Sequence, residues 1–188
     1  MKWNRKFVYP KSIRSTDNGI RRYLIGEKKV PSVTSILEAT KSEEDKAALA
    51  NWVERTGLKE SEAIVKAASN RGSKMHAYLE SFLLGQQNLS FFDDNEQYKI
   101  MAKQIIEKGL INRFEEVWGV ECTLYKPDSY SGTCDAVGVY DGRESIIDFK
   151  QSNKPKKFEY IDSWLLQTAA YSLAHNTVYN SNITACVI

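Results

Sequence analysis

The sequence predicts a mixed α/β (α+β) fold whose core runs helix, three-strand meander, helix and strand, preceded by a helical region and a basic hairpin. Apolar residues recur at helical spacing from about residue 31 to about residue 118 and again after residue 161. Between these stretches, polar and apolar residues alternate with the two-residue period of a strand. The length of 188 residues and the 42% hydrophobic content fit one globular domain, residues 1–188, and exclude a chain that is disordered throughout.

The first 30 residues are expected to form the basic hairpin. Strand-like runs at Trp3–Tyr9 and Ile20–Ile25 flank the turn-rich segment 15–19. Nine Lys and Arg residues stand against Asp17 and Glu27 in residues 1–30, so this segment carries +7 while the whole chain carries +2. Such a segment is either a binding surface for a polyanion or merely a solvated edge.

Residues 31–118 are expected to be mainly helical. Ser32 caps a short helix that runs to about residue 38, and Ser42 followed by Asp45 resembles a capping box for a helix that stops at Gly57. The segments 59–85 and 93–118 continue with apolar residues at helical spacing.

Residues 119–188 are expected to form the core of the fold. Strand patterns cover residues 120–125, 132–140 and 145–150, and Asp141-Gly142 between the last two is a strong signal for a two-residue hairpin turn. The stretch 161–179 returns to helical spacing, and 183–188 indicates a last strand. The expected buried face of the helix is made of Leu165, Leu166, Ala169, Ala170 and Leu173.

Several classes of function are disfavoured by what the sequence lacks. Cys122, Cys134 and Cys186 are far apart and are expected to be reduced core residues, so we expect neither a disulfide framework nor an iron–sulfur cluster. The chain has no Gly-x-x-x-x-Gly-Lys-Ser/Thr phosphate loop, so we expect no use of ATP. No apolar run approaches the roughly 18 residues of a membrane span, and we expect a soluble, cytoplasmic protein without membrane contact.

The expected hairpin brings acidic side chains together. A two-residue turn at Asp141-Gly142 fixes the cross-strand register and places Asp135 opposite Asp148. Opposed carboxylates repel each other unless a cation lies between them, and Mg²⁺ or Mn²⁺ suits carboxylate oxygens. Alternation puts Lys150 on the same face as Asp148. The alternative interpretation is a solvated face with one cross-strand ion pair.

These residues belong to a longer pattern. Gly132-Thr133-Cys134-Asp135, followed by Asp148-Phe149-Lys150 and then by Gln167 and Tyr171, resembles the PD-(D/E)XK nuclease signature of the RecB-like exonucleases. Two further segments, Pro31–Leu37 and Arg71–His76, resemble the N-terminal helical motifs of that group. The stretch 148–156 is similar to the mitochondrial genome maintenance exonucleases and their phage relatives.

The resemblance implies a restriction-endonuclease-like core and a metal-dependent DNA exonuclease. Such an enzyme hydrolyses phosphodiester bonds, here in single-stranded or end-bearing DNA, during replication, recombination or DNA degradation; for a phage protein the location is the host cytoplasm. The implied ligands of Mg²⁺ (or Mn²⁺) are His76, Asp135, Asp148 and the Phe149 backbone carbonyl. The implied role of Lys150 is to orient or activate the attacking water and to stabilise charge on the phosphate.

Three further residues are candidates at this site. Gln167 and Tyr171 lie four residues apart on one helix face, and the resemblance implies that they contact the substrate strand or steady the lysine. The alternative places Tyr171 in the core and Gln167 at the rim. Glu121, on the first strand of the meander, is an additional candidate that would reach the metal through water, with simple solvent exposure as the alternative.

Basic residues next to the site suggest where DNA lies. Positive charge follows the catalytic motif directly, and the candidates for contact with DNA are Lys154, Lys156, Lys157, Gln167, Tyr171 and Arg71. The N-terminal cluster would extend the same track through Arg14, Arg21, Arg22, Lys28 and Lys29. The alternative for each run is a solvated surface.

Other functions are compatible with the same residues. The site would also serve a structure- or sequence-directed endonuclease of the same fold. Two alternatives without catalysis are a DNA-binding module and a basic protein-interaction domain that holds no metal. The sequence indicates no particular protein partner.

Overall fold

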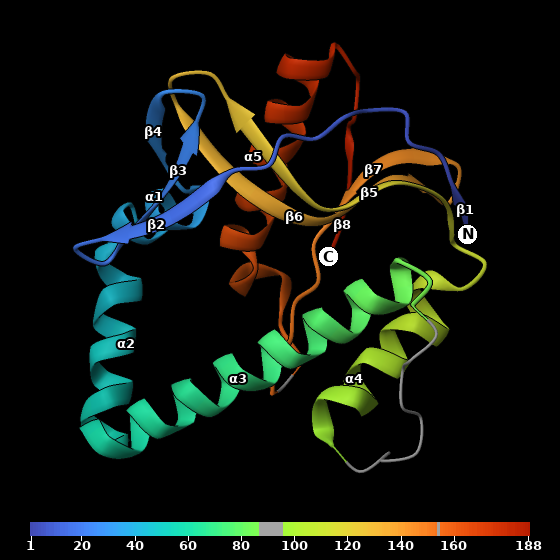
Figure 1. The fold of residues 1–188 in the computed structure, drawn as a ribbon. Coiled ribbons are helices and arrows are strands. Elements are labelled where there is room, and N and C mark those ends of the chain that lie inside the picture. The colour runs from blue at the N-terminus through green and yellow to red at the C-terminus, as the bar shows by residue number, and fades with distance from the viewer. Residues whose placement is uncertain (87–95, 154) are drawn as a thin grey trace.

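The computed structural model describes residues 1–86, 96–153 and 155–188 of the chain. Within these residues the fold is α+β, as predicted, with a five-stranded mixed sheet, a three-stranded antiparallel sheet and helices packed around them (Figure 1). The helices that the structure describes include none with the length and apolar character of a membrane span.

The five-stranded sheet has the order β1-β5-β6-β7-β8. Its centre is the predicted meander of β5 (Phe114–Lys126), β6 (Tyr130–Tyr140) and β7 (Arg143–Ile147), while β1 (Lys2–Trp3) and β8 (Ala185–Val187) add parallel strands at the edges. The turn at Asp141-Gly142 has positive φ at both residues and pairs β6 with β7 in the predicted register.

The small sheet lies in the region of the predicted basic hairpin, but of the two predicted strands only Ile20–Ile25 belongs to it. It consists of β2 (Ile13–Asp17), β3 (Ile20–Ile25) and β4 (Lys28–Pro31). The predicted strand Trp3–Tyr9 is wrong, because only Lys2–Trp3 is a strand and it joins the large sheet. The aromatic rings that suggested a strand pack in the core instead, where Phe7 lies against Trp118 and His175, and Tyr9 lies against Tyr179.

Three helices follow, with the predicted caps. Ser32 caps α1 (Val33–Ala39) and accepts a hydrogen bond from the Ser35 amide at 3.0 Å. Ser42 caps α2 (Glu43–Thr56), which ends where Gly57 takes a φ of +85°. The longest helix, α3 (Leu58–Leu83), runs below the large sheet (Figure 1).

The predicted helix 93–118 is wrong in its second half. The structure has α4 (Gln97–Ile105), a π-helical turn (Ile106–Leu110) and then strand β5, which begins at Phe114. The part of the prediction before residue 96 lies outside the described residues. Apolar residues of β5, such as Phe114 and Trp118, continue the helical spacing by coincidence, so periodicity alone did not reveal the change to a strand.

A short 3-10 turn (Phe158–Tyr160) leads into α5 (Asp162–Tyr179), for which the predicted buried face is wrong. Leu166 is 57% and Leu173 48% exposed, and Ala169 is also exposed. The helix instead buries Gln167, Thr168, Tyr171, Ser172, Ala174 and His175. Their polar groups form hydrogen bonds inside the molecule, which offsets the free-energy cost of burying this face.

Two apolar clusters define three layers. On one face of the large sheet, α3 and α4 pack through Met75, Leu79, Ala102, Phe114, Ile147 and Phe149. On the other face, α1 and α5 pack through Val33, Trp118, Val137, Tyr171, Ala174 and Ile183. Of the cysteines, Cys122 and Cys134 are buried as predicted, whereas Cys186 is exposed because it lies on the edge strand β8.

Candidate active site and metal centre

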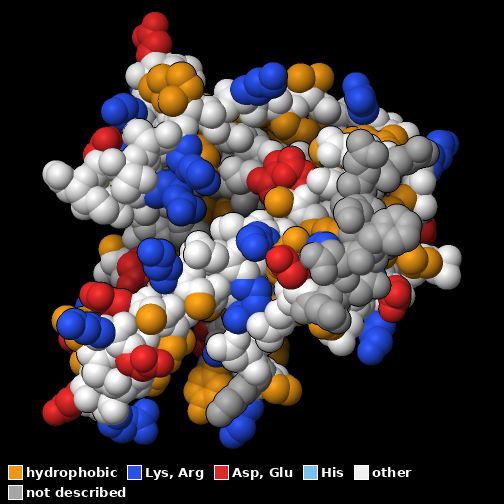
Figure 2. All heavy atoms as spheres, turned by 60° about the horizontal axis from the view of Figure 1, so that its bottom comes forward, with side chains coloured by type: hydrophobic (Ala, Val, Ile, Leu, Met, Phe, Trp, Pro, Cys, Tyr) orange, Lys and Arg blue, Asp and Glu red, His pale blue; other side chains and the backbone are white. Residues whose placement is uncertain are grey.

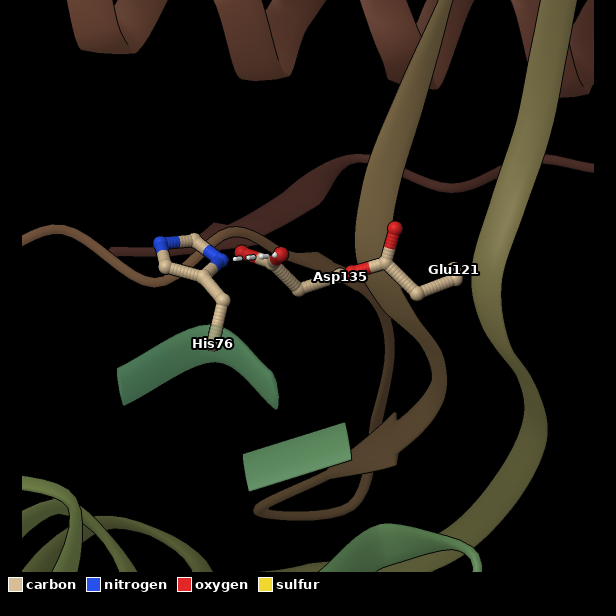
Figure 3. Close-up of side chains that lie close together, drawn as sticks. All are labelled: His76, Glu121 and Asp135. Atoms are coloured by element: carbon tan, nitrogen blue, oxygen red, sulfur yellow. Dashed lines mark hydrogen bonds and ion pairs between the residues drawn. The ribbon is translucent and has the colours of Figure 1, made fainter. Parts of the chain in front are cut away.

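Three side chains from three different elements converge at one place in the molecule. His76 comes from α3, Glu121 from β5 and Asp135 from β6, and they point toward one another (Figure 3). One ligand atom from each lies within 4.8 Å of those of the other two. An imidazole nitrogen and carboxylate oxygens at this spacing form a donor set that fits a divalent cation.

The register of β5 and β6 brings Glu121 to this position. Cys122 pairs with Cys134, so the adjoining residues Glu121 and Asp135 lie opposite each other. Glu121 also has a φ of +50°, in the left-handed region, which marks a local departure from regular strand geometry. The turn at residues 127–129 joins β5 to β6 and fixes this register. The Glu121–Asp135 pair could therefore be predicted from the sequence in the same way as the pairing of β6 with β7.

Asp135 is held from two sides. Its Oδ1 lies 2.7 Å from His76 Nδ1, and its Oδ2 accepts a hydrogen bond from the Phe149 backbone amide. The carboxylate side chain is only 10% exposed. The backbone amide of Phe149 therefore contacts the site through the Asp135 carboxylate. Ligation of a metal by the Phe149 carbonyl remains a prediction.

Asp148 lies beside the three converging side chains and is not one of them. Strand β7 ends at Ile147, so the predicted strand 145–150 is too long, and the Asp148 amide bonds to the Val187 carbonyl of β8 at 3.0 Å. The Asp148 carboxylate forms an ion pair with Lys150, as the predicted common face requires. The β6–β7 ladder ends at the pair Ala136–Ile147, one position before the expected pair of Asp135 and Asp148, and both carboxylates line the same cleft.

Lys150 is positioned by a chain of hydrogen bonds from α5. Its Nζ donates to Gln167 Oε1 at 3.0 Å, and Gln167 Nε2 donates to the Tyr171 hydroxyl at 2.9 Å. Gln167 is 8% and Tyr171 2% exposed, so both lie inside the molecule, and burial raises the pKa of Tyr171. The structure brings together all of the residues predicted to be catalytic, with Gln167 and Tyr171 placed behind the lysine.

The acidic groups create a field that favours positive charge. Burial alone would lower the pKa of His76, but the hydrogen bond with Asp135 and the charges of Asp135 and Asp148 raise it. Loss of hydration, followed by the charges of Asp135 and Glu80, raises the pKa of the Glu121 carboxyl to about 7. Burial and then the charge of Asp135 raise the pKa of Asp148. A divalent cation among these groups would offset the repulsion between the carboxylates, which adds to the effect of burial on the pKa of Glu121 and Asp148.

The site opens as a cleft of about 270 Å³. Its lining includes the candidate metal and catalytic side chains and, from the small sheet, Arg14, Arg21 and Tyr23; the former are His76, Glu121, Asp135, Asp148, Lys150, Gln167 and Tyr171. Figure 2 shows acidic side chains together near the middle of one face of the molecule, with Lys and Arg side chains around them. A larger hollow of about 650 Å³ between α4 and β8 is lined by no Asp or Glu side chain of the described residues, so the candidate metal ligands lie in the smaller cleft.

Gly132 and the Tyr171 ring fit each other at the floor of this cleft. A Cβ at residue 132 would lie 2.5 Å from Tyr171 Cε1, closer than real carbon contacts allow. The Tyr171 ring therefore fills the space over Gly132, and this close packing holds the ring in place. The Tyr171 hydroxyl in turn orients Gln167.

Arg71 organises the loop after Lys150. Its guanidinium donates to Gln151 at 2.9 Å and to Gln97 at 3.2 Å, and it also bonds Asn153. Sequence reasoning missed these partners, because nothing in the local pattern marks Gln151 or Asn153. Within the described residues, these hydrogen bonds tie Arg71 to the loop. A contact of Arg71 with DNA remains a prediction.

The lysine run is only partly described. Lys156 and Lys157 are exposed, and Lys156 borders the larger hollow next to Lys150. Lys154, the third member of the predicted run, lies outside the described residues. Their contact with DNA remains a prediction.

Comparison with known proteins relates the chain to a nuclease. It is 29% identical over 172 residues to mitochondrial genome maintenance exonuclease 1 of Homo sapiens, covering 85% of the chain and 48% of that protein. It is 31% identical over 132 residues to the protein of the same name from Mus musculus, covering 68% of the chain and 38% of that protein. The chain thus spans about half the length, or less, of these relatives, and no family model matches it. The chain is therefore a homologue of mitochondrial genome maintenance exonuclease 1, a relationship with which the PD-(D/E)XK resemblance is consistent.

Proposed function

We propose that the protein is a deoxyribonuclease of the PD-(D/E)XK type that hydrolyses phosphodiester bonds with the help of Mg²⁺ or Mn²⁺. One observation carries the proposal: His76, Glu121 and Asp135 converge in the same cleft as the Asp148–Lys150 ion pair. Carboxylates and an imidazole supply metal ligands, and a neighbouring ammonium group supplies charge for a phosphate. The relationship to an exonuclease supports the same reaction class.

The metal would be held by His76, Glu121 and Asp135, with Asp148 next to them. When bound, a divalent ion makes an attacking water more acidic and neutralises charge on the phosphate. The protein contributes a fixed cradle for it, because Asp135 is anchored by the Phe149 amide and His76 by Asp135. The side-chain exposure of Asp135 is 10%, so little water competes at that carboxylate.

Lys150 would face the phosphate that is cut. Its ammonium group donates hydrogen bonds to the phosphate oxygens and stabilises the negative charge that develops there. Asp148 and Gln167 hold the ammonium group at a fixed place, and Tyr171 fixes the orientation of the Gln167 amide. Gln167 and Tyr171 are positioning residues in this scheme.

We further propose that the enzyme acts as an exonuclease on single-stranded or end-bearing DNA in replication, recombination or DNA degradation. The test is digestion of linear DNA labelled at its 5′ or 3′ end and of closed circular single-stranded DNA, each with Mg²⁺ and with EDTA. Loss of label from linear DNA only, and only with Mg²⁺, is the expected result. Cleavage of the circles would instead favour an endonuclease of the same fold.

A catalytic role is separated from a binding role by two variants. Asp148→Ala and Lys150→Ala are expected to abolish cleavage while the protein keeps a cooperative melt. Binding of oligonucleotides by the unaltered protein without cleavage at any Mg²⁺ or Mn²⁺ concentration would identify a DNA-binding module. Absence of a Ca²⁺- or Mg²⁺-induced rise in melting temperature would contradict the metal site itself.

A further inference from the structure

Arg14 and Arg21 of the small sheet lie on the same face of that sheet as Tyr23, which contacts strand β6. In the β2–β3 register, Arg14 pairs with Tyr23 and Thr16 pairs with Arg21. Because side chains two residues apart point to the same side of a strand, Arg14, Arg21 and Tyr23 lie on one face. Arg22 lies between the last two and points to the opposite face, so it does not line the cleft and is separated from the DNA track for which the sequence made it a candidate.

This face is turned toward the active-site cleft. Tyr23 is 4% exposed, and its hydroxyl lies 3.4 Å from Thr133 Oγ1, two residues before Asp135 on β6. The position of the sheet is also fixed at α1, since the Arg21 amide donates to Ser35 Oγ at 3.0 Å. Arg14 and Arg21 accordingly line the same cleft of about 270 Å³ as the carboxylates.

The two guanidinium groups are available to a ligand. Both arginines are exposed, and within residues 1–86, 96–153 and 155–188 neither side chain has a hydrogen-bond or ion-pair partner. The neighbouring lysines of the small sheet differ, because Lys28 pairs with Asp128 at 2.7 Å and Lys29 with Asp17 at 3.5 Å. The cationic charge that is free to act in the cleft is therefore concentrated on the two arginines.

We propose that Arg14 and Arg21 form a clamp for the DNA backbone, holding phosphates next to the one that is cut. The proposal rests on the proposed nuclease function and adds a substrate subsite to it. Phosphate is the chemistry that this wall fits, because a guanidinium group presents paired donors to phosphate oxygens. The opposite wall of the cleft carries carboxylates, which repel the backbone except where a cation or Lys150 receives it. The two arginines thus draw the strand across the cleft and leave one phosphate at the metal site.

The clamp is tested with matched variants of neighbouring arginines. Arg14→Gln and Arg21→Gln each remove a cation from the cleft face, whereas Arg22→Gln removes the same charge from the opposite face. Binding of a fluorescein-labelled single-stranded oligonucleotide is followed by anisotropy in EDTA and in Ca²⁺ over a range of salt concentrations. Each cleft variant is expected to bind about tenfold more weakly, and the slope of log K against log salt is expected to flatten by about 0.7 per lost contact.

Kinetics and rescue separate this role from a structural one. With Mg²⁺, the cleft variants are expected to raise KM with little change in kcat, because they remove contacts made equally in ground and transition states. Arg14→Lys and Arg21→Lys are expected to recover most of the salt slope, since a lysine keeps the charge. Arg22→Gln is expected to match the unaltered protein in KM and slope.

The outcomes distinguish the clamp from the function on which it rests. If the protein cleaves DNA but the cleft variants bind and cleave like Arg22→Gln, the clamp is wrong and the nuclease stands. If the cleft variants lose binding selectively but the unaltered protein cleaves nothing with Mg²⁺ or Mn²⁺, the arginines contact DNA and the nuclease proposal is wrong. Equal loss in the Gln and Lys variants, with lower melting temperatures, would show a structural role and overturn the clamp.

Discussion

Gly132→Ala tests how tightly the floor of the site is packed. The added Cβ would lie 2.5 Å from Tyr171 Cε1 and 2.8 Å from its hydroxyl oxygen. The ring is 2% exposed and holds Gln167 at 2.9 Å, so it has no free space to yield. Overpacking of this kind costs about 1–3 kcal/mol, and each kcal/mol lowers the melting temperature of a chain of this size by about 2–4 °C. We expect a melting temperature about 2–12 °C lower and a reduced kcat, because a displaced tyrosine loosens the amide that holds Lys150.

Thermal melts, urea titrations and single-turnover cleavage measure these effects. Gly72→Ala is the control, since its Cβ would meet Gln151 at an ordinary 3.6 Å and an alanine favours helix α3 by up to about 1 kcal/mol. In a Tyr171→Ala background the penalty of Gly132→Ala should disappear, because the colliding ring is gone. An unchanged melting temperature for Gly132→Ala, or the same penalty in both backgrounds, would refute the packing argument.

The pKa of the Glu121 carboxyl is raised to about 7, so its charged form costs folding stability at and above that pH. Glu121→Gln removes this cost, and the metal-free variant should therefore melt higher than the unaltered protein at pH 8 but not at pH 4. The variant should also gain less in melting temperature from added Ca²⁺. Burial lowers the pKa of His175 to about 4, while the unfolded chain protonates it near 6.5. Its contribution is therefore complete above pH 6.5 and falls by on the order of 3 kcal/mol toward pH 4, a loss that urea titrations of His175→Gln should lack. Arg71→Ala releases the loop that follows Lys150 and should accelerate limited proteolysis at residues 151–153, with a lower kcat; proteolysis at the original rate would contradict its role in holding the loop.

Features that depend on local chemistry were predicted correctly from the sequence. Ser32 and Ser42 cap their helices because a hydroxyl satisfies free amides of the first turn wherever the helix packs. The Asp141-Gly142 turn fixed the register of β6 and β7, since only residues that accept positive φ make such a turn. The alignment of acidic and basic groups followed from this register, and the nearness of Asp135, Asp148 and Lys150 could be inferred before the structure was known.

Features that depend on tertiary partners were not predicted. The apolar residues of α5 suggested that Leu166 and Leu173 are buried, yet the helix buries Gln167 because Lys150 and Tyr171 satisfy its amide. The convergence of Glu121 on Asp135 depends on the register of the second hairpin, β5–β6, which the Asp141-Gly142 turn does not determine. Composition and periodicity contain no information on which distant element supplies a polar partner, and this decides which face of a helix is buried.

We propose that a cation held by His76, Glu121 and Asp135 enables this cleft to cut DNA. The decisive experiment incubates end-labelled linear single-stranded DNA with the unaltered protein and with Asp135→Asn, each in Mg²⁺ and in EDTA. We predict digestion by the unaltered protein in Mg²⁺ alone and none by the variant in either condition. Equal digestion in EDTA, or by a folded Asp135→Asn protein, would contradict the claim.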